Sequence, residues 1–421
     1  MAKDTHTPRW AQQLMDKHGI SEPPKAGEIP SWLKQEVEQK PLWYIIREAD
    51  GVRSSHPFIL IDEIYREPDQ LQEILESYGD QAKRLAKELH DRGIEEVIFT
   101  GCGSAFFTAM HGEYVFERLT GLRSRAIESF ELTYYFPEID TAKTAVIAHS
   151  GTGGSIETRE AVDESNKRGV YTIAATNTVG SPLQLLANES LYYETEQRCG
   201  PCINVISTRI MLVTMLGIEL GLLRSPNSEW LKSLQSQLPR IPEVARSFIK
   251  EQEDHVRSLA EKYKDIASFF LIGTGPNYFS AREGTLKIEE ESICVSKAYR
   301  PGDFLHDVIS ILHPTNCTIA IAGNERTNYR IADCLDTANA AESSSVAVVF
   351  GDNDSIAAHA KDTIRMQGGL DEILVPIPLT LVFQMFGYYR GVARGYNPDT
   401  LRTDYWPNAK AWITAFPIGT H

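Results

Sequence analysis

The chain has 421 residues, of which 42% are hydrophobic and 24% charged, and its formal net charge is −15. This length predicts two domains plus an extension. The acidic balance argues against nucleic acid and anionic membranes as partners, because no broad basic field is available to neutralise phosphates. We find no apolar run of roughly 18 residues and no signal sequence in MAKDTHTPRW, so we expect a cytoplasmic protein.

Residues 1–90 are predicted to form a helical N-terminal extension. Proline-rich punctuation in SEPPKAGEIPSW precedes three helical stretches, SWLKQEVEQ, PDQLQEILESYG and QAKRLAKELHDRG. The segment is too broken to form a domain by itself, so we expect it to pack over its neighbours.

Residues 91–225 alternate between short apolar runs and amphipathic stretches. Strands are expected at 96–101, 123–129, 144–150, 170–177 and 191–196, and helices at 104–121, 155–169 and 203–223. Short runs rich in valine and isoleucine between helices are typical of a parallel sheet covered on both faces.

The same alternation restarts after a helical connector at 226–264. Apolar runs at 268–275, 295–299, 318–323, 346–351 and 372–378 predict strands, and helices are expected at 278–293, 330–341 and 379–395. Residues 265–395 therefore form a second unit, and 396–421 are a C-terminal tail. The predicted class is α/β, with two parallel sheets flanked by helices in flavodoxin-like sandwiches.

Ligands of such sheets bind beyond the carboxyl ends of the strands, which directs attention to two loops. GCGS at 101–104 follows one predicted strand, and SGTGGSIET at 150–158 follows another. The second segment offers glycines, hydroxyls and free backbone N–H groups at a helix start, which is how an anion such as phosphate is held. An ordinary turn with Ser155 as the helix N-cap explains the pattern equally well.

A third stretch, GTLKIEEESICVSKAYRPGDFLHD at 284–307, combines a cation, carboxylates and an imidazole. Lys287 lies three residues before Glu290 and four before Glu291, so a helix places them on one face. His306 follows a turn at 300–303. These groups suit proton transfer next to a carbonyl. The alternative is a solvated ion-pair face and a structural histidine.

Six cysteines are interpreted mainly as small buried residues of a reduced compartment. Cys199 and Cys202 form a C-x-x-C pattern before a predicted helix, where a dithiol role is conceivable. No thioredoxin-like unit surrounds this pattern, so the redox hypothesis stays open as the weaker one. No zinc-type spacing occurs, and we expect no metal.

Several motifs together resemble a known family. GCGSA, the SG…ET segment, NTVGSP at 177–182, NVIST at 204–208 and GTLKIEEES…YRPGDFLH match, in order and spacing, the tandem sugar isomerase (SIS) domains of phosphosugar-binding proteins. The likeness is greatest to the isomerase half of glucosamine-6-phosphate synthase and runs from about residue 55 to residue 415. The sequence shows no glutaminase domain, so glutamine is not expected as its ammonia source.

The resemblance implies two groups of substrate-binding residues. Those expected to bind phosphate are Ser104, Ser150, Ser155 and Thr158. Those expected to contact the sugar are Val205 and Ser207. The 150–158 segment is two residues longer than usual in the family, and Ala105 and Ala148 replace common hydroxyls, so another anion remains possible.

The resemblance also implies catalytic roles. Glu290 resembles the general base that moves a proton between C1 and C2, and Lys287 would stabilise the enediolate-like charge. His306 resembles the ring-opening histidine supplied across a dimer interface, and Lys410 the tail lysine that closes over the sugar. A homodimer or higher homo-oligomer is therefore expected, with no cofactor.

Three functions remain open from the sequence. The first is aldose–ketose isomerisation of a sugar phosphate, with an amino sugar favoured and loss of ammonia or an amine possible. The second is deglycation of a ketosamine 6-phosphate through an imine that water hydrolyses; retention of Lys410 leans against it. The third is a non-catalytic phosphosugar sensor, for which the full set of Lys287, Glu290 and His306 would be unnecessary.

Overall fold

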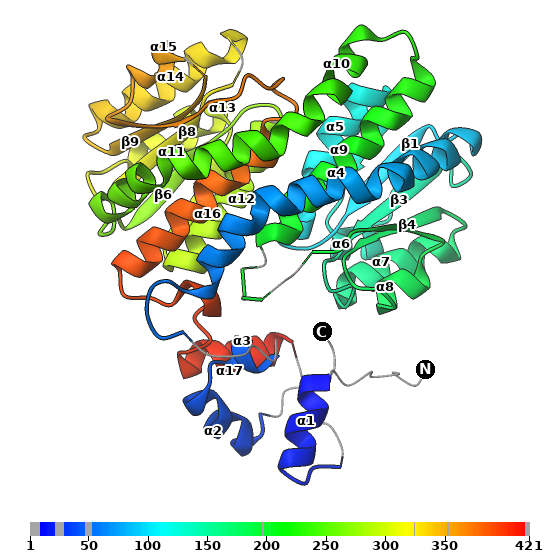
Figure 1. Cartoon of the computed structure of the whole chain (residues 1–421), viewed down its shortest axis with the longest axis horizontal. Helices are drawn as coiled ribbons and strands as arrows, with labels where there is room; N and C mark the ends of the chain where they lie inside the picture. The colour runs from blue at the N-terminus through cyan, green and yellow to red at the C-terminus, as the bar shows by residue number, and fades with distance from the viewer. Residues whose placement is uncertain are drawn as a thin grey trace.

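The structure is a computed structural model that describes residues 9–21, 29–46, 53–195, 198–201, 203–323, 325–351 and 353–416. It contains two five-stranded parallel sheets with helices on both faces (Figure 1), which confirms the predicted α/β class. The first sheet has the order β2-β1-β3-β4-β5 and the second the order β10-β9-β8-β6-β7. Read from the opposite edge, the second order repeats the first, so the two halves share one topology.

The first sheet and its helices come from the first unit. Its strands are β1 (Glu96–Thr100), β2 (Arg123–Ala126), β3 (Thr144–His149), β4 (Tyr171–Thr176) and β5 (Glu189–Tyr192). Its helices are α5 (Ser104–Thr120), α6 (Ser129–Tyr134), α7 (Ile156–Lys167), α8 (Pro182–Leu186) and α9 (Ile203–Arg224). Every residue of β1 and β3 is buried, as the apolar runs predicted for strands covered on both faces.

The second sheet repeats this plan. Its strands are β6 (Ser268–Ile272), β7 (Val295–Tyr299), β8 (Asn316–Ile321), β9 (Ser344–Phe350) and β10 (Asp362–Met366). Its helical segments are α12 (Asn277–Ser292), α13 (Pro301–Asp303), η2 (Phe304–Val308), η3 (Ile309–Ile311), α14 (Glu325–Ala340), α15 (Asp354–Ala357) and α16 (Pro376–Ala393).

One predicted strand of this unit is wrong. The apolar run 372–378 forms no strand but leads into α16, with Pro376 at the helix start. Proline has no N–H to donate to a strand ladder and suits the first helical turn. The fifth strand is β10, which pairs with β9 at the sheet edge and is only partly buried, so its apolar signal is weak.

The helices that join and cover the sheets pack on one another. They are α4 (Ile59–Asp91), α10 (Glu229–Gln237), η1 (Leu238–Arg240) and α11 (Ile241–Lys262). Figure 1 shows α4 running across both halves, and it contacts α9, α11 and α16. The two helices predicted at 68–79 and 81–93 are therefore one helix with Pro68 inside it. Burial of its apolar stripe outweighs the hydrogen bond that proline removes.

Helix α9 contradicts the expectation that the chain has no apolar stretch long enough to span a membrane. Val205–Arg224 is long and apolar enough to cross a membrane by composition, with a mean hydropathy of 1.7. However, 89% of that stretch is buried inside the protein. It is the core helix of the first half, and its hydrophobic surface is covered by α4 and α5.

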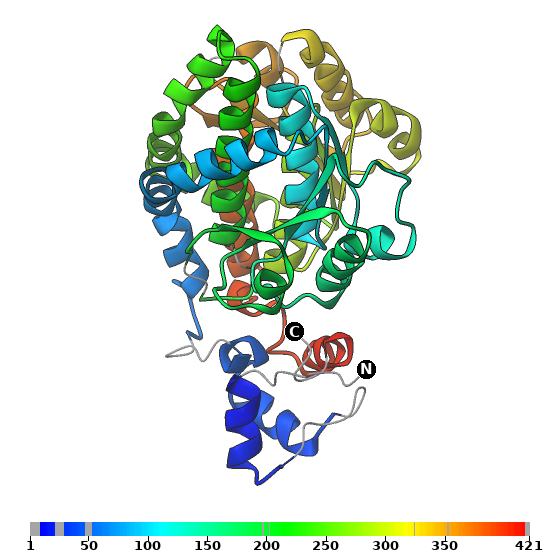
Figure 2. The same cartoon turned by 90° about the vertical axis from the view of Figure 1, so that its right-hand side faces the viewer.

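A smaller cluster lies below the two sheets (Figures 1 and 2). It contains α1 (Arg9–Lys17), α2 (Ser31–Gln39), α3 (Leu42–Ile46) and, from the other end of the chain, α17 (Trp406–Ala415). Its own apolar core includes Trp32, Leu33, Ala409 and Ile413. The tail reaches it through η4 (Pro398–Thr400), which contacts α3, α4, α12 and α16.

Candidate active site

Helix α12 is pressed closely against α16, and glycines allow this approach. A Cβ added at Gly284 would lie 2.6 Å from the ring of Phe383. A Cβ added at Gly387 would lie 2.5 Å from Glu291 Oε2 and 3.0 Å from the Lys287 carbonyl oxygen. The close contact buries the face of α12 that carries Lys287, which is 0% exposed.

Lys287 is the centre of a buried charge network. Its Nζ donates to Glu290 Oε2 at 2.6 Å and to the carbonyl of Pro201 at 3.0 Å, and Glu283 Oε1 lies 3.5 Å away. The Glu290 side chain is 23% exposed, whereas Glu283 is 3% exposed. The arrangement pairs a partly exposed carboxylate with a buried ammonium that two other groups hold in place.

Opposing effects set the protonation of these groups. Burial lowers the pKa of Lys287, but Glu290, Glu283 and Glu291 together raise it above its ordinary value, so the ammonium persists. Burial raises the pKa of Glu290, and Lys287 partly offsets this by stabilising the carboxylate. Glu290 is therefore a stronger base than a solvated glutamate and still pairs with a cation.

Glu291, the other carboxylate predicted on this helix face, has a different environment. Neither of its oxygens has a hydrogen-bond partner among the described residues, and burial raises its pKa well above the ordinary value. It lies in the packed contact with α16 beside Gly387 and not toward open space.

The first half reaches this network through two segments. Ser104, the first residue of α5, donates its Oγ to Glu283 Oε1 at 3.3 Å. Pro201, just before α9, supplies the carbonyl that accepts from Lys287, and the adjacent Gly200 N donates to the Asp399 carbonyl at 2.8 Å. The candidate site thus lies where the two halves and the tail meet.

The 150–158 segment forms a compact turn between β3 and α7. Ser150 Oγ lies 3.1 Å from Ser155 Oγ and accepts from Gly153 N at 3.1 Å. Ser155 is the N-cap residue of α7, but its side chain makes no capping bond. Ser155 therefore occupies the predicted N-cap position without a side-chain capping bond, which leaves N–H groups at the start of α7 available to a ligand.

Other predicted binding residues have neighbours of their own. Val205 Cγ1 lies 3.1 Å from the position of a Cβ on Gly151, so α9 touches the 150–158 segment there. Thr158 Oγ1 lies 3.2 Å from Ser129 Oγ, and the buried Ser207 side chain lowers the pKa of Glu67 against the larger, opposite effect of burial. The roles of these three residues in binding stay predictions.

His306 and Lys410 do not join the network within one chain. His306 lies exposed on η2, and no hydrogen bond or ion pair connects it with another described residue. Lys410 is exposed on α17, which packs on α2 below the sheets (Figure 1). Trp406 packs into that small cluster and Tyr405 is 53% exposed, so Trp406 serves as an anchor for the tail.

A family comparison agrees with this architecture. The SIS domain model matches residues 92–219 and again residues 262–389. The chain belongs to the SIS domain family. Each match contains one of the two parallel sheets, so the protein is a tandem SIS protein.

Named relatives cover most of this chain. Glutamine–fructose-6-phosphate aminotransferase (isomerizing) of Thermococcus kodakarensis is 27% identical over 374 residues, or 87% of this chain. The protein of the same name from Aeropyrum pernix is 29% identical over 83% of it. The chain spans only 60% and 57% of the lengths of these two relatives.

Solved structures share the fold. The C-terminal domain of glucosamine-fructose-6-phosphate aminotransferase from Francisella tularensis superimposes with a TM-score of 0.74 at 17% identity, covering 82% of this chain and 98% of its own. Tagatose-6-phosphate ketose/aldose isomerase from Escherichia coli gives 0.69 at 16% identity, covering 84% and 97%. At these identities the similarity concerns the fold alone.

The SIS site contains residues that our sequence analysis missed. Glu283 lies four residues before Lys287 and seven before Glu290, and this spacing on one helix face was a usable signal. Arg209 lies one turn after Val205 on α9, against the 150–158 segment. Pro201 contributes through its backbone, for which the sequence offers no signal.

The cysteines of this SIS protein contribute little to the site. Cys199, Cys294, Cys317 and Cys334 are buried, as predicted. Cys102 lies beside Glu128, and burial together with that carboxylate raises the pKa of its thiol to about 12. Cys202 lies outside the described residues, so the dithiol hypothesis remains untested.

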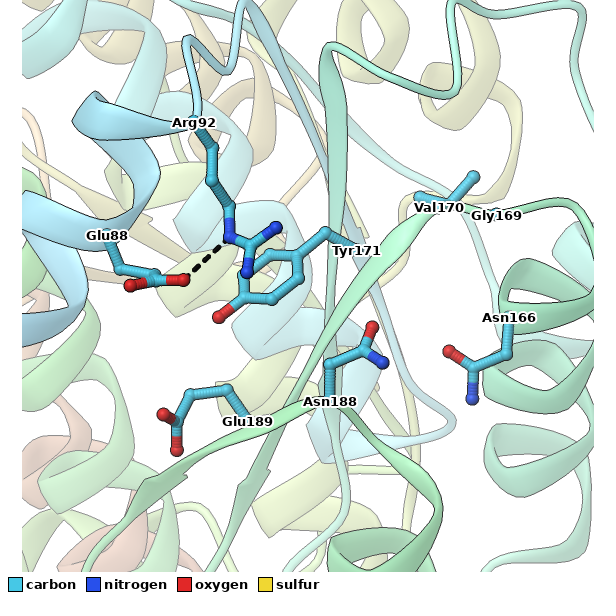
Figure 3. Close-up of a pocket in the computed structure, with 8 residues that line it drawn as sticks. All are labelled: Glu88, Arg92, Asn166, Gly169, Val170, Tyr171, Asn188 and Glu189. Atoms are coloured by element: carbon cyan, nitrogen blue, oxygen red, sulfur yellow. Dashed lines mark hydrogen bonds and ion pairs between the residues drawn. The ribbon is translucent and has the colours of Figure 1, made fainter.

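A separate pocket at the opposite end of the first SIS sheet contrasts with this site (Figure 3). It has a volume of about 430 Å³, and Tyr171 and Glu189 at the starts of β4 and β5 help to line it. Arg92 donates to Glu88 at 2.7 Å and stacks over the Tyr171 ring at 3.9 Å. Glu189 is paired with Arg84 at 2.6 Å, so these charges are already satisfied by the protein itself.

Proposed function

We propose that this SIS protein is a sugar-phosphate aldose–ketose isomerase, with an amino-sugar phosphate as the favoured substrate. The observation that carries the proposal is the contact of 2.6 Å between Lys287 Nζ and Glu290 Oε2, in a network that also includes Ser104 of the other SIS domain. Proton transfer between adjacent carbons requires one base and a stabilised oxyanion, and this pair supplies both. The names of the relatives, which include isomerizing enzymes of sugar phosphates, agree with this class.

In the proposed reaction, the Glu290 carboxylate removes a proton from the carbon next to the carbonyl. Negative charge then develops on the carbonyl oxygen, and the Lys287 ammonium stabilises this enediolate. The protonated Glu290 then delivers the proton to the former carbonyl carbon, while a proton passes from the hydroxyl on the adjacent carbon to the former carbonyl oxygen, which completes the exchange of aldose and ketose. The Pro201 carbonyl and Glu283 hold the ammonium in place.

The phosphate would bind at Ser104, Ser150, Ser155 and Thr158, and Val205 and Ser207 would face the sugar. His306 would open the sugar ring from the second subunit of a homodimer. Its exposure beside Ile309 and Ile311, which are 52% and 55% exposed, supports an interface at this surface. We place the enzyme in the cytoplasm.

A second candidate is a ketosamine 6-phosphate deglycase. The position of Lys410 favours it, since this lysine lies on an exposed face of α17 and would require movement of the tail to close over a sugar. The same base would shift the double bond, after which water hydrolyses the imine and the amine leaves. Both reactions begin with proton removal by Glu290.

Deuterium exchange tests the proposal. Purified protein is incubated in deuterated water with fructose 6-phosphate plus ammonia, glucosamine 6-phosphate or a set of ketosamine phosphates, and products are followed by NMR and mass spectrometry. We expect deuterium at C1 or C2 with the wild type, and a rate lower by at least about 100-fold with Glu290→Gln. The released fragment separates isomerase from deglycase.

Glu289→Gln is the matched control, since Glu289 is exposed on the same helix and accepts from Ser296 N at 3.2 Å, outside the network. Its exchange rate should stay within a few-fold of the wild type. Absence of exchange with every substrate, together with retained sugar-phosphate binding, would contradict the enzymatic proposal and favour a sensor.

A further inference from the structure

Arg209 is a buried cation that the catalytic network does not use. It lies one helical turn beyond Val205 on α9, and its residue exposure is 3%. Its Nε donates to the Tyr193 hydroxyl at 2.7 Å, whereas its Nη1 has no hydrogen-bond partner among the residues that the structure describes. Within the described part of the chain, no carboxylate forms an ion pair with this guanidinium.

The guanidinium lies against the 150–158 segment. Its Nη2 is 3.4 Å from the position that a Cβ on Gly151 would occupy, so only a glycine leaves this space open. The same segment leads into the twelve-residue helix α7, whose N-cap Ser155 makes no capping bond. The free N–H groups there and the helix dipole favour an anion, and Arg209 adds a full positive charge beside them.

Arg390 on α16 shows how this fold satisfies a purely structural buried arginine. Its Nε donates to the Tyr263 carbonyl at 3.1 Å, and its Nη2 donates to the carbonyls of Lys264 and Ile266 at 2.9 and 2.7 Å. Its Nη1 donates to Ser292 Oγ at 2.9 Å. Within the described residues Arg209 has a single such bond, although an uncompensated buried charge is destabilising.

The neighbouring histidine does not compete for an anion. His149, at the end of β3, is fully buried, and neither ring nitrogen has a partner among the described residues. Burial first and Arg209 second lower the pKa of His149 well below its ordinary value. The imidazole is therefore neutral at pH 7, and Arg209 is the cation next to the 150–158 segment.

We propose that Arg209 is an anion-binding residue that, with the start of α7 and the hydroxyls of Ser150 and Ser155, holds a phosphate monoester. A guanidinium presents paired N–H donors that match phosphate oxygens, and a dianion gains more from this combination than a neutral sugar would. The identity of the phosphate as part of a sugar substrate rests on the proposed function. The anion site itself does not.

Calorimetric titration of the full chain with inorganic phosphate tests this inference. The variant Arg209→Met should bind phosphate at least tenfold more weakly than the wild type. Arg209→Lys keeps the charge but loses the paired N–H donors of the guanidinium, so its phosphate affinity should lie between the two. Arg224→Met is the matched control, since Arg224 lies at the other end of α9 and donates to the Thr120 carbonyl at 2.8 Å. Its phosphate affinity should not change.

Phosphate affinity in Arg209→Met within twofold of the wild type would overturn the inference and assign Arg209 a structural role. Circular dichroism checks that each variant is folded. If Arg209→Met does not fold, Arg209→Lys decides: an affinity equal to the wild type contradicts the inference, and a drop of at least threefold supports it. A wild type that binds no phosphate at millimolar concentration also overturns it.

The exchange assay separates this inference from the proposed function. Glu290→Gln should bind phosphate as the wild type does, because the anion site does not include Glu290. Phosphate binding that depends on Arg209, without any deuterium exchange, would support the anion site and contradict the proposed isomerase activity. Deuterium exchange with an unchanged KM in Arg209→Met would support the isomerase and contradict the anion site. A KM that rises by a larger factor than kcat falls would support both the isomerase and the anion site.

Discussion

The helices that close the two SIS domains, α9 and α16, each bury one arginine, and they surround it differently. Arg390 on α16 is 0% exposed and donates from all three nitrogens to acceptors of the protein. Arg209 on α9 is 3% exposed and, within the described part of the chain, makes a single hydrogen bond, to Tyr193. Burial of a charge therefore does not distinguish a structural group from a binding group. The state of its hydrogen bonds does.

The largest expected effect follows from removing the satisfied arginine. Arg390→Met leaves the carbonyls of Tyr263, Lys264 and Ile266 without their donor, and we expect the free energy of unfolding to fall by about 3–5 kcal/mol. Urea denaturation in phosphate-free buffer measures it. In the same buffer Arg209→Met should change stability by less than about 1 kcal/mol, because an uncompensated charge disappears with it. An equal loss of unfolding free energy in the two variants would contradict the distinction between a structural and a binding arginine.

A carboxyl between the two helices should make stability depend on pH. Glu67 of α4 is fully buried and accepts from Thr380 Oγ1 of α16 at 3.1 Å, and Ser207 of α9 lowers its pKa without offsetting the effect of burial. Burial raises the pKa of Glu67 to about 8. The folded state keeps a proton that the unfolded state releases near its ordinary pKa of 4.5, so stability falls as pH rises from about 4.5 through 8.

Glu67→Gln should remove this part of the pH dependence. Relative to the wild type, the variant should gain stability between pH 5 and pH 9, at no more than about 1.4 kcal/mol per pH unit. Thermal unfolding over this range measures the gain. Glu76→Gln, on the exposed face of α4 where Glu76 pairs with Gln72, should follow the wild-type curve. A parallel shift of both variants would contradict the assignment.

A smaller difference is expected between glycines of the two helices. In Gly387→Ala the new Cβ would meet Glu291 Oε2 and the Lys287 backbone oxygen, so α12 must move, at a cost of about 1–3 kcal/mol. The deuterium-exchange rate should fall as well, since Glu290 lies on the displaced helix.

In Gly217→Ala of α9 the nearest atom is Leu119 Cδ1 at 3.1 Å, the end of a flexible side chain that can rotate away. We therefore expect less than about 1 kcal/mol of change there, measured by urea denaturation of both variants. An equal cost would show that the approach of α12 to α16 does not depend on Gly387.

Much of the fold was predictable because it depends on local periodicity. The buried runs around Ile98, Ile147, Leu271 and Ile319 predicted strands that the structure contains. The exceptions have local causes. The edge strand β10 is half-buried and weakly apolar, and Pro68 suggested a break where packing on α9 keeps one continuous helix.

The candidate site was predictable only along single elements. Lys287 and Glu290 are three residues apart on one helix, so their contact follows from helical geometry. The bond from Ser104 to Glu283 joins residues 179 positions apart, and that from Lys287 to Pro201 joins residues 86 apart. Neither is visible in the sequence, because such contacts exist only once both domains have packed.

By itself, the sequence determined the two repeated α/β units, the loops after the strands and the helix face that carries Lys287 and Glu290. These features depend on short-range spacing, which the chain carries in any context. The tertiary structure alone decided that Ser104 and Pro201 join the network and that Lys410 lies on the small helical cluster. It also decided that every guanidinium nitrogen of Arg390 has a hydrogen-bond acceptor, whereas Nη1 of Arg209 has none among the described residues. The partners of a buried side chain come from distant segments that only folding brings together.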